Sequence, residues 1–215
     1  AFGSADFSPP PSSPRQPHGL AGALPFLRNS IHFSLMIIGC LGKGGSGKSS
    51  VATALIHTAE RLGYSTLAID ADHNMDLLFN LMGEVSDMPY LGSRRAEIVR
   101  LLGVEPGERL FARVLREPRH SISLASDDPL LMLAARERSS GHWLMAAGPH
   151  TEEVQRGTAC SHVLANVLKA ILPLLALKER EVAVVDSTAG MDMVGSGISV
   201  GMDLCYVVCE PTIHS

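Results

Sequence analysis

The sequence has 215 residues, 46% of them hydrophobic, and a formal net charge of −4 at pH 7. A chain of this length and composition can bury one sizeable core, so we expect one globular domain with an appendage. Acidic residues slightly outnumber basic ones, and the basic residues form no long continuous run. Both features argue against nucleic acid or an anionic membrane surface as the partner.

Four cysteines are too few and too scattered for a disulfide framework, which predicts a reducing, cytoplasmic location. The longest apolar stretch, residues 163–177, is interrupted by Asn166, Lys169 and Pro173 and is too short to cross a bilayer. No basic start leads into an apolar run at the N-terminus, so we expect neither a signal peptide nor a transmembrane segment.

The first 34 residues differ in composition from the rest. The stretch SPPPSSPRQPHG is rich in Pro and Ser, so residues 1–34 are predicted to form a disordered tail. Met36 opens an apolar run directly before a Gly-rich loop, and we expect it to be the natural start of the chain. Residues 35–215 are predicted to form the folded domain.

Strands and helices alternate through that domain. The predicted strands cover residues 33–41, 65–70, 142–148, 181–186 and 202–210, and the predicted helices cover 48–62 and 161–177, with a mostly helical stretch at 84–140. The last two strands are near-continuous apolar runs, which are typical of strands buried on both faces. Cys40, Cys205 and Cys209 are therefore expected in the core. This alternation predicts an α/β fold with a doubly wound, mostly parallel sheet.

The stretch GKGGSGKS, residues 42–49, carries a phosphate-loop pattern. Gly42, four further residues and then Gly47-Lys48-Ser49 fit G-x-x-x-x-G-K-[ST], between an apolar strand and a periodic helix. In such a loop the glycine backbone cradles phosphates, the lysine reaches the β- and γ-phosphates, and the hydroxyl ligates Mg²⁺. The expected contacts with ATP are Gly42, Lys43, Gly44, Gly45, Ser46, Gly47, Lys48, Ser49 and Ser50.

A second lysine in this motif, Lys43, narrows the class of phosphate-loop protein. The motif KGGSGKS resembles the deviant phosphate loop of the MinD, ParA and nitrogenase-iron-protein group of ATPases. The resemblance implies that Lys43 reaches the nucleotide of the other subunit in a nucleotide-dependent homodimer that hydrolyses ATP to ADP. A second cation on the γ-phosphate would stabilise charge in the transition state. The alternative is a solvated loop lysine.

Acidic residues follow two of the predicted strands. Asp70, Asp72 and Asp76 come after the second strand, and Asp186 ends the strand EVAVVD. The carboxyl ends of parallel strands form the ligand-binding edge of such sheets. The resemblance implies that Asp72 orients the attacking water, that Asp76 lies near Mg²⁺ and that Asp186 is the Walker B aspartate. Lys43, Lys48 and Asp72 are thus the expected catalytic residues, and Ser49, Asp76 and Asp186 the expected Mg²⁺ site.

The stretch VVDSTAGMDMVGSGISVGMDLCYVVCEP resembles the accessory ATPases that insert nickel into carbon monoxide dehydrogenase, the CooC type. The places of that family's motif are occupied here by Asp186, Ala189-Gly190, Asp192, Gly195-Ser196-Gly197 and Glu210-Pro211. The resemblance implies a metalloenzyme client and an ATPase cycle coupled to assembly of a nickel centre.

That family also carries a Cys-x-Cys pair before the helix that precedes Walker B. Cys160 and His162 occupy those places here, so the pair departs from the family pattern. One thiolate and one imidazole from each of two subunits would give four ligands suited to Ni²⁺ or Zn²⁺. The alternative is that Cys160 is a small residue at the start of a helix and that His162 is solvated.

Two further hypotheses stand beside the nickel-insertion ATPase. One is a MinD- or ParA-like ATPase for spatial regulation or partition, which would need a C-terminal amphipathic helix or a basic patch. The other is an inactive remnant, because family members continue beyond the Glu-Pro pair with elements that include an adenine-reading asparagine. On this comparison we expect the domain to be incomplete at its C-terminal end.

Overall fold

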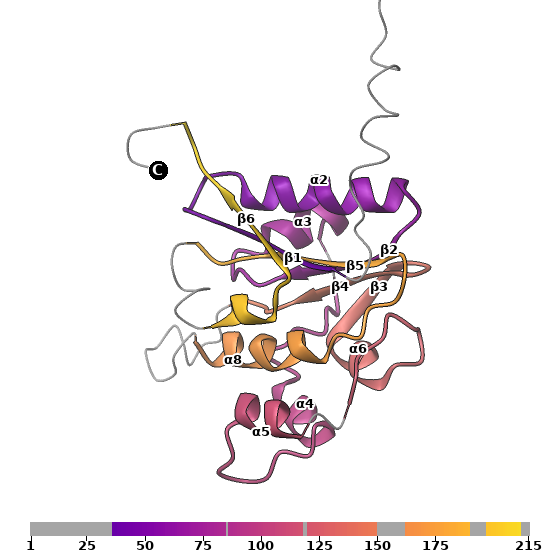
Figure 1. Ribbon diagram of the computed structural model, residues 1–215, viewed down its shortest axis with the longest axis vertical. Coiled ribbons are helices and arrows are strands. Elements are labelled where there is room, and N and C mark those ends of the chain that lie inside the picture. The colour runs from indigo at the N-terminus through magenta and orange to yellow at the C-terminus, as the bar shows by residue number, and fades with distance from the viewer. Residues whose placement is uncertain (1–35, 85, 118–119, 150–161, 190–196, 212–215) are drawn as a thin grey trace, which may run out of the picture. The chain divides into compact units, whose positions relative to one another are not determined.

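The structure is a computed structural model that describes residues 36–84, 86–117, 120–149, 162–189 and 197–211 (Figure 1). The chain divides into two compact units, residues 1–32 and residues 33–215, and all described residues belong to the second. The predicted tail at residues 1–34 therefore lies outside the described residues.

A six-stranded sheet forms the centre of the second unit. Its strands are β1 (Met36–Gly42), β2 (Ser65–Asp70), β3 (Ala135–Ser139), β4 (His142–Ala146), β5 (Glu181–Asp186) and β6 (Leu204–Val208). They lie in the order β3-β4-β2-β5-β1-β6, and all neighbours are parallel except β3 and β4. The predicted α/β fold with a mostly parallel sheet is confirmed.

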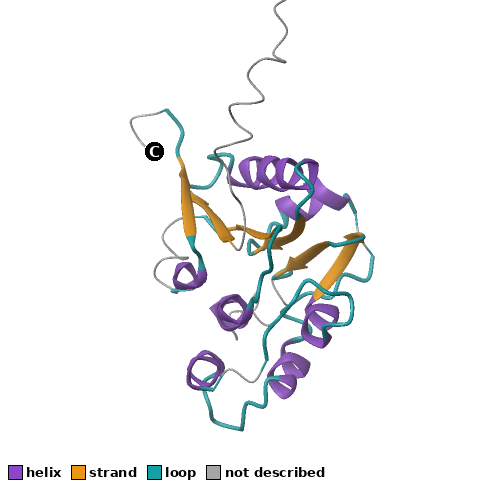
Figure 2. Cartoon of the chain, turned by 45° about the vertical axis from the view of Figure 1, so that its right-hand side comes forward, coloured by secondary structure: helices purple, strands orange, loops and turns teal. Residues whose placement is uncertain are grey.

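Helices cover both faces of the sheet, as Figures 1 and 2 show. The helices are α2 (Lys48–Arg61), α3 (Asp76–Met82), α4 (Arg95–Leu101), α5 (Leu110–Arg116), α6 (Pro129–Ala134) and α8 (His162–Ile171), with short 3₁₀ turns η2 (Leu172–Leu174) and η3 (Ile198–Gly201). α2 and α3 lie on one side of the sheet, and α8, α4 and α5 lie on the other. None of the helices among the described residues is long and apolar enough to span a membrane.

Alternate residues of the central strands belong to two separate hydrophobic cores, one on each face of the sheet. Leu67 and Ile69 of β2 belong to the core beneath α8, whereas Ala68 belongs to the core beneath α2. This period of two is what a strand buried on both faces requires. It also explains why the apolar stretches of β1, β2 and β5 were identified from the sequence.

Several predicted boundaries differ from the observed ones. The helix expected over 161–177 ends at Ile171, because Pro173 cannot continue an α-helix and the chain tightens into η2. The strand expected over 142–148 ends at Ala146. The stretch 84–140 was expected to be mostly helical, but among its described residues only the short helices α4, α5 and α6 form, joined by turns and loops. Its last residues form β3, an antiparallel edge strand with alternating burial.

The prediction that the last strand is buried on both faces is wrong. Four of the five residues of β6 are exposed and the fifth is half-buried. β6 lies at the end of the sheet and makes extensive contact only with β1 among the described elements. Cys205 and Cys209 are consequently exposed rather than in the core, whereas Cys40 is buried as expected.

Candidate functional site

The loop that joins β1 to α2 depends on glycine at three places. Gly45 and Gly47 have positive φ angles of 81° and 91°, a backbone conformation that residues with a Cβ rarely adopt. Gly42 has φ 153°, and a Cβ there would collide with the carbonyl oxygen of Val208 in β6 and press on Oγ of Ser46. The backbone can therefore turn tightly enough for successive N–H groups to converge on one point.

The N-terminus of α2 faces that loop without a cap. Gly47 occupies the N-cap position, makes no side-chain hydrogen bond, and is followed by no acidic residue in the first turn. The first backbone N–H groups of a helix have no partner inside the helix and carry a partial positive charge. An uncapped start after a glycine loop is a ready-made phosphate site.

Lys48 crosses the loop from the first position of α2. Its side chain is buried, and Nζ donates a hydrogen bond of 3.1 Å to the carbonyl oxygen of Lys43. A buried ammonium must be partnered, and here the loop's own backbone is the partner. Lys43 itself is exposed. Lys48 is thus held where phosphates would lie, while Lys43 is accessible from solvent.

Two carboxylates lie side by side at the ends of the central strands. Asp70 of β2 and Asp186 of β5 are register partners, and neither side chain is exposed to solvent. Burial raises the pKa of Asp70 to about 7 and the pKa of Asp186 to about 6. The nearby Ser49 hydroxyl and the charge of Lys48 lower the pKa of Asp186, and the charges of Asp72 and Asp76 raise it.

The carboxylate oxygens of Asp186 are placed where they could bind a metal ion or a water molecule. Both are buried, and neither makes a hydrogen bond of good geometry with another described residue. Buried carboxylate oxygens normally have partners, so this pair is suited to bind a cation or water. Ser49 lies beside it on α2, which matches the hydroxyl-plus-aspartate pair that a phosphate loop presents to Mg²⁺.

The segment after β2 presents two more acids. Asp72 accepts a 3.1 Å hydrogen bond from the backbone N–H of Asn74, and its carbonyl accepts one of 3.2 Å from Met75. Asp76 is the first residue of α3 and is exposed. Asp72 and Asp76 both line the cavity that the phosphate loop forms, so this edge of the sheet is strongly acidic.

One cavity of about 340 Å³ brings these residues together. Its lining comes from the phosphate loop, the start of α2, the segment after β2, α3 and the segment after β5: Gly44, Gly45, Gly47, Lys48, Ser49, Ser50, Asp72, Asn74, Asp76, Asn80 and Ala189. This volume is in the range of small-molecule sites. Most of the predicted site residues thus meet in a single place.

Sequence reasoning missed Asn74 and Asn80, which line the cavity. Ala189 was identified as part of the motif after Asp186, but its contact with the loop was not; its Cβ lies 3.7 Å from where a Cβ on Gly44 would be. Asn80 follows Asp76 by four residues, so both lie on the same face of α3. That spacing was the available signal. No signal in the sequence predicts the contact of Ala189 with the loop, because that contact depends on how two strand ends meet.

Some predicted residues are not placed. Cys160, Gly190 and Asp192 lie outside the described residues, and His162 begins α8 without a described side chain. Within the described part of the chain, no three His, Cys, Asp or Glu side chains are grouped closely enough to hold a metal ion. Glu210 is exposed and lies near the loop, with Oε1 3.9 Å from where a Cβ on Gly45 would be.

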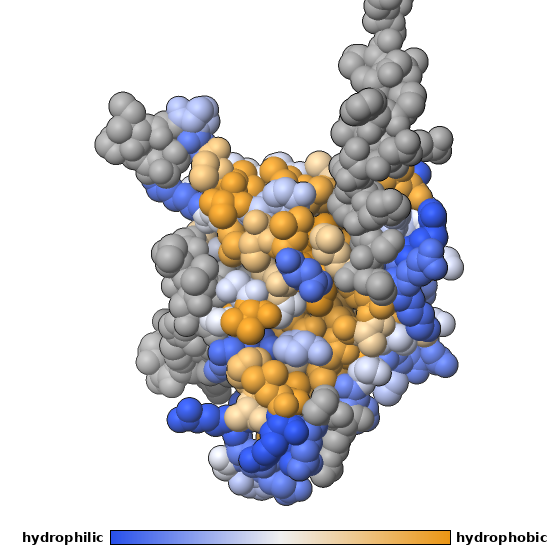
Figure 3. Space-filling model, viewed as in Figure 1, coloured by the Kyte–Doolittle hydropathy of each residue, from blue (hydrophilic) through white to orange (hydrophobic). Residues whose placement is uncertain are grey.

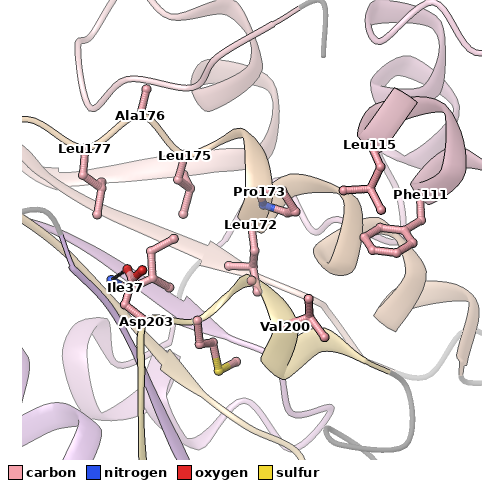
Figure 4. A pocket seen from close by; sticks show the side chains of 12 residues that line it. Ile37, Phe111, Leu115, Leu172, Pro173, Leu175, Ala176, Leu177, Val200 and Asp203 are labelled. Carbon is pink, nitrogen blue, oxygen red and sulfur yellow. Dashed lines mark hydrogen bonds between the residues drawn. The ribbon is translucent and has the colours of Figure 1, made fainter. Parts of the chain in front are cut away.

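A second cavity, of about 440 Å³, lies at the opposite end of β1, near Ile37 (Figure 4). Asp203 is the one charged residue in its lining, and its Oδ2 accepts a 2.7 Å hydrogen bond from the backbone N–H of Ile37. The other lining residues are apolar apart from a glycine. This cavity contains none of the predicted site residues, so the nucleotide site is assigned to the loop.

The fold and this loop define an α/β P-loop nucleotide-binding protein. The family model described as "CobQ/CobB/MinD/ParA nucleotide binding domain" (CbiA) matches residues 37–172. The chain belongs to this family, which confirms the resemblance to the MinD and ParA class.

Similar proteins are known from sequence and from structure. The uncharacterized ATP-binding protein MJ0084 of Methanocaldococcus jannaschii is 31% identical over 185 residues, covering 84% of this chain and 69% of that protein. A second one from the same organism, MJ0823, is 29% identical over 180 residues, covering 84% of this chain and 65% of that protein. This chain therefore spans about two thirds of the length of these relatives.

Two solved structures are more distant. A plasmid partition protein from Borrelia burgdorferi is 16% identical with a TM-score of 0.42, over 80% of this chain and 63% of that one. The kinase domain of the Escherichia coli tyrosine kinase ETK is 16% identical with a TM-score of 0.43, over 91% of this chain and 63% of that one.

Proposed function

We propose that this protein is a Mg-ATP-dependent ATPase that dimerises when it binds nucleotide. The observation that carries the proposal is the convergence of an uncapped helix N-terminus, a buried lysine and acidic side chains on one cavity. A helix start and a lysine suit phosphate, whereas the acids suit a divalent cation, and Mg-ATP supplies both.

Each residue then has a distinct role. Residues 42–50 bind the phosphates through their backbone N–H groups, and Lys48 exchanges the carbonyl of Lys43 for a phosphate oxygen. Ser49 and Asp186 hold Mg²⁺, with Asp76 nearby, and bound Mg²⁺ neutralises charge on the phosphates. Asp72 orients the attacking water, because its carboxylate faces the same cavity.

Lys43 is proposed to act on the nucleotide of a second subunit. Its exposure supports this role, because a lysine that serves a neighbour must project from its own subunit. The test is to mix two inactive variants. Lys43→Gln subunits bind ATP but lack the lysine for the partner, whereas Lys48→Ala subunits lack ATP but still supply Lys43.

ATPase activity that returns on mixing Lys43→Gln with Lys48→Ala supports action in trans, because only a mixed dimer contains a complete site. Lack of recovery, together with a mass by light scattering that stays monomeric in Mg-ATP, argues against it. GTP and ATP compared in the same assay test whether the site selects adenine. Wild-type protein that binds Mg-ATP without turnover would contradict the enzymatic part of the proposal.

We further propose that the ATPase cycle serves assembly of a nickel centre in a metalloenzyme of the carbon-monoxide-dehydrogenase type. Support comes from the sequence pattern that runs from Asp186 to Glu210-Pro211 and from Cys160 and His162 just before or at the start of α8. A metal held between two subunits would couple its binding to the dimer. The reducing, cytoplasmic location that we propose agrees with free thiols at Cys40, Cys205 and Cys209.

Equilibrium dialysis with Ni²⁺ and Zn²⁺ in Mg-ATP tests this part. Cys160→Ser and His162→Ala are each expected to abolish the binding of one metal ion per dimer. Cys209→Ser, which removes an exposed thiol elsewhere, is the matched control. Metal binding that is unchanged in Cys160→Ser, or lost equally in the control, contradicts it. ATP-dependent sedimentation with DNA or anionic vesicles would favour the second candidate, a MinD- or ParA-like regulator.

The domain boundary is also proposed rather than observed. We propose a P-loop ATPase domain over residues 35–215 preceded by a tail over residues 1–34, on the basis of the change in composition at Met36. Limited proteolysis in Mg-ATP should then give a stable product that begins near Met36. A product that retains residues 1–34 would contradict this boundary.

A further inference from the structure

Asp70 is a buried carboxylate at the nucleotide edge whose two oxygens are both bonded to the backbone, unlike those of its neighbour Asp186. It is the last residue of β2, which lies between β4 and β5, and its side chain is fully buried. It is absent from the residues that line the cavity, although Asp72, two positions later, is among them. A carboxylate in such a place needs hydrogen-bond donors from the protein itself.

Those donors are two backbone N–H groups on either side of the acidic segment. Oδ1 of Asp70 accepts a 3.1 Å hydrogen bond from the N–H of Asp72, and Oδ2 accepts one of 2.8 Å from the N–H of Leu78. One carboxylate thus joins two points that are six residues apart. Asp72 lies at one end of the segment between these points, and Asp76 lies within it. Both acids line the cavity.

The hydrogen bond to Leu78 replaces a cap that α3 lacks. The N-cap residue of α3 is Met75, which makes no side-chain cap and has a left-handed backbone with φ 58°. Left-handed conformations are unfavourable for residues with a Cβ and persist only where the surroundings hold them. Leu78 is the third residue of α3, so its N–H is one of the groups that need a partner outside the helix.

We propose that Asp70 is a positioning residue whose carboxylate sets the shape of the segment from Asp72 to Leu78 and so directs Asp72 and Asp76 into the nucleotide cavity. This inference rests on the proposed function, because the proposed function assigns Asp72 and Asp76 their roles in binding and hydrolysing Mg-ATP. In this proposal Asp70 acts through the backbone and binds neither nucleotide nor metal itself. Its contribution is to fix where the water-orienting carboxylate lies relative to the loop.

The variant Asp70→Asn tests the proposal. An asparagine has nearly the same shape, but its amide offers only one oxygen, so the NH₂ group faces a backbone N–H in place of an acceptor. One of the two hydrogen bonds is therefore lost and replaced by a contact between two donors. Misplacement of a catalytic group by about 1 Å lowers turnover by about 10- to 100-fold.

Asp128→Asn is the matched control. Asp128 is also nearly buried, and its Oδ1 accepts from the backbone N–H groups of Leu130 (3.0 Å) and Leu131 (2.9 Å) at the start of α6. It thus performs a similar capping role, but it does not line the nucleotide cavity. Any general effect of weakening a buried cap should appear in both variants.

We expect kcat at saturating Mg-ATP to fall about tenfold or more in Asp70→Asn, with affinity for ATP in the absence of Mg²⁺ within about twofold of wild type. Asp128→Asn is expected to lose thermal stability and keep its kcat. Equal kcat values in the two folded variants would overturn the inference. Wild-type protein without any turnover would instead overturn the proposed function.

Hydrogen exchange of the full-length wild type gives a reading that needs no variant. The amides of Asp72 and Leu78 should exchange at least about 100-fold more slowly than in an unstructured peptide, because both are bonded to a buried carboxylate. Exchange at the peptide rate for either amide would overturn the proposal even if Asp70→Asn fails to fold. This reading does not depend on hydrolysis, so the two hypotheses can fail separately.

Discussion

Nζ of Lys48 donates a hydrogen bond to the carbonyl oxygen of Lys43, five residues earlier in the same loop. The two lysines of the motif are therefore coupled through the backbone of one and the side chain of the other. When a phosphate replaces the carbonyl as the partner of Lys48, the loop at Lys43 loses an internal contact. If Lys48 binds phosphate as proposed, we expect nucleotide binding at Lys48 to change the surroundings of Lys43.

Replacing Lys48 by Ala should abolish most of the affinity for ATP. A hydrogen bond between charged groups contributes about 1.5–3 kcal/mol, which corresponds to about 10- to 100-fold in the dissociation constant. Because the charge of Lys48 favours the charged form of the buried Asp186, we expect Lys48→Ala to lose stability as well, so affinity is measured below the Tm of the variant. Titration with a fluorescent ATP analogue measures this, with Lys43→Gln as the control that should keep affinity within a few-fold.

The buried carboxylates predict that the free protein becomes less stable as the pH rises. Burial raises the pKa of Asp186 from 3.8 to about 6 and the pKa of Asp70 from 3.8 to about 7. Between about pH 4 and pH 7 the folded state therefore binds more protons than the unfolded state, so the free energy of unfolding falls with increasing pH. At and above pH 7, charged buried carboxylates destabilise the fold.

Thermal unfolding between pH 5 and pH 7.5 tests this expectation against Asp186→Asn. The wild type should have its higher Tm at pH 5, and Asp186→Asn should flatten the slope and raise Tm at pH 7.5. One pKa unit corresponds to about 1.4 kcal/mol, so the effect of Asp186 is on the order of 3 kcal/mol. Mg²⁺ should stabilise only the wild type at pH 7.5, and a parallel pH profile in the variant would contradict the assignment.

The sequence was sufficient to find the parts of the site that are local. Gly42 to Ser49 form one continuous stretch, so the spacing alone identified the loop and the helix that follows it. Asp72 and Asp186 were found because Asp72 follows one apolar strand closely and Asp186 ends another, and parallel strands end at the same edge. In each case the signal lies within a few residues of the functional group.

The features that the sequence did not reveal depend on distant neighbours. Burial of β6 could not be inferred from its apolar composition, because it depends on what covers the strand. The two bonds that Asp70 accepts link residues up to eight positions apart, and a carboxylate that binds metal looks the same in sequence as one that caps a helix. Asn80 reaches the cavity only because α3 packs against α2.

Replacing Gly42 by Ala should damage the loop more than a similar change elsewhere. A Cβ at Gly42 collides with the backbone of Val208, whereas a Cβ at Gly107, also at positive φ, meets nothing within 4 Å. Both variants bear the left-handed backbone cost of about 1 kcal/mol, but only Gly42→Ala adds overpacking of about 1–3 kcal/mol. Chemical denaturation measures the difference, and equal losses in the two variants would contradict the close approach of β6 to the loop.

The exposed strand β6 should promote self-association. Val207 is 69% exposed on the last strand of the sheet, and Figure 3 shows hydrophobic residues gathered on the face where β6 lies in Figure 1. An exposed apolar edge strand can pair with another chain, and a lysine on such a strand blocks pairing. Val207→Lys should therefore reduce light scattering at high concentration without nucleotide. Met132→Lys changes a side chain of similar exposure, 60%, that lies on a helix, α6, and not on a strand. An equal reduction in Met132→Lys would show that association follows general surface hydrophobicity and not the edge of β6.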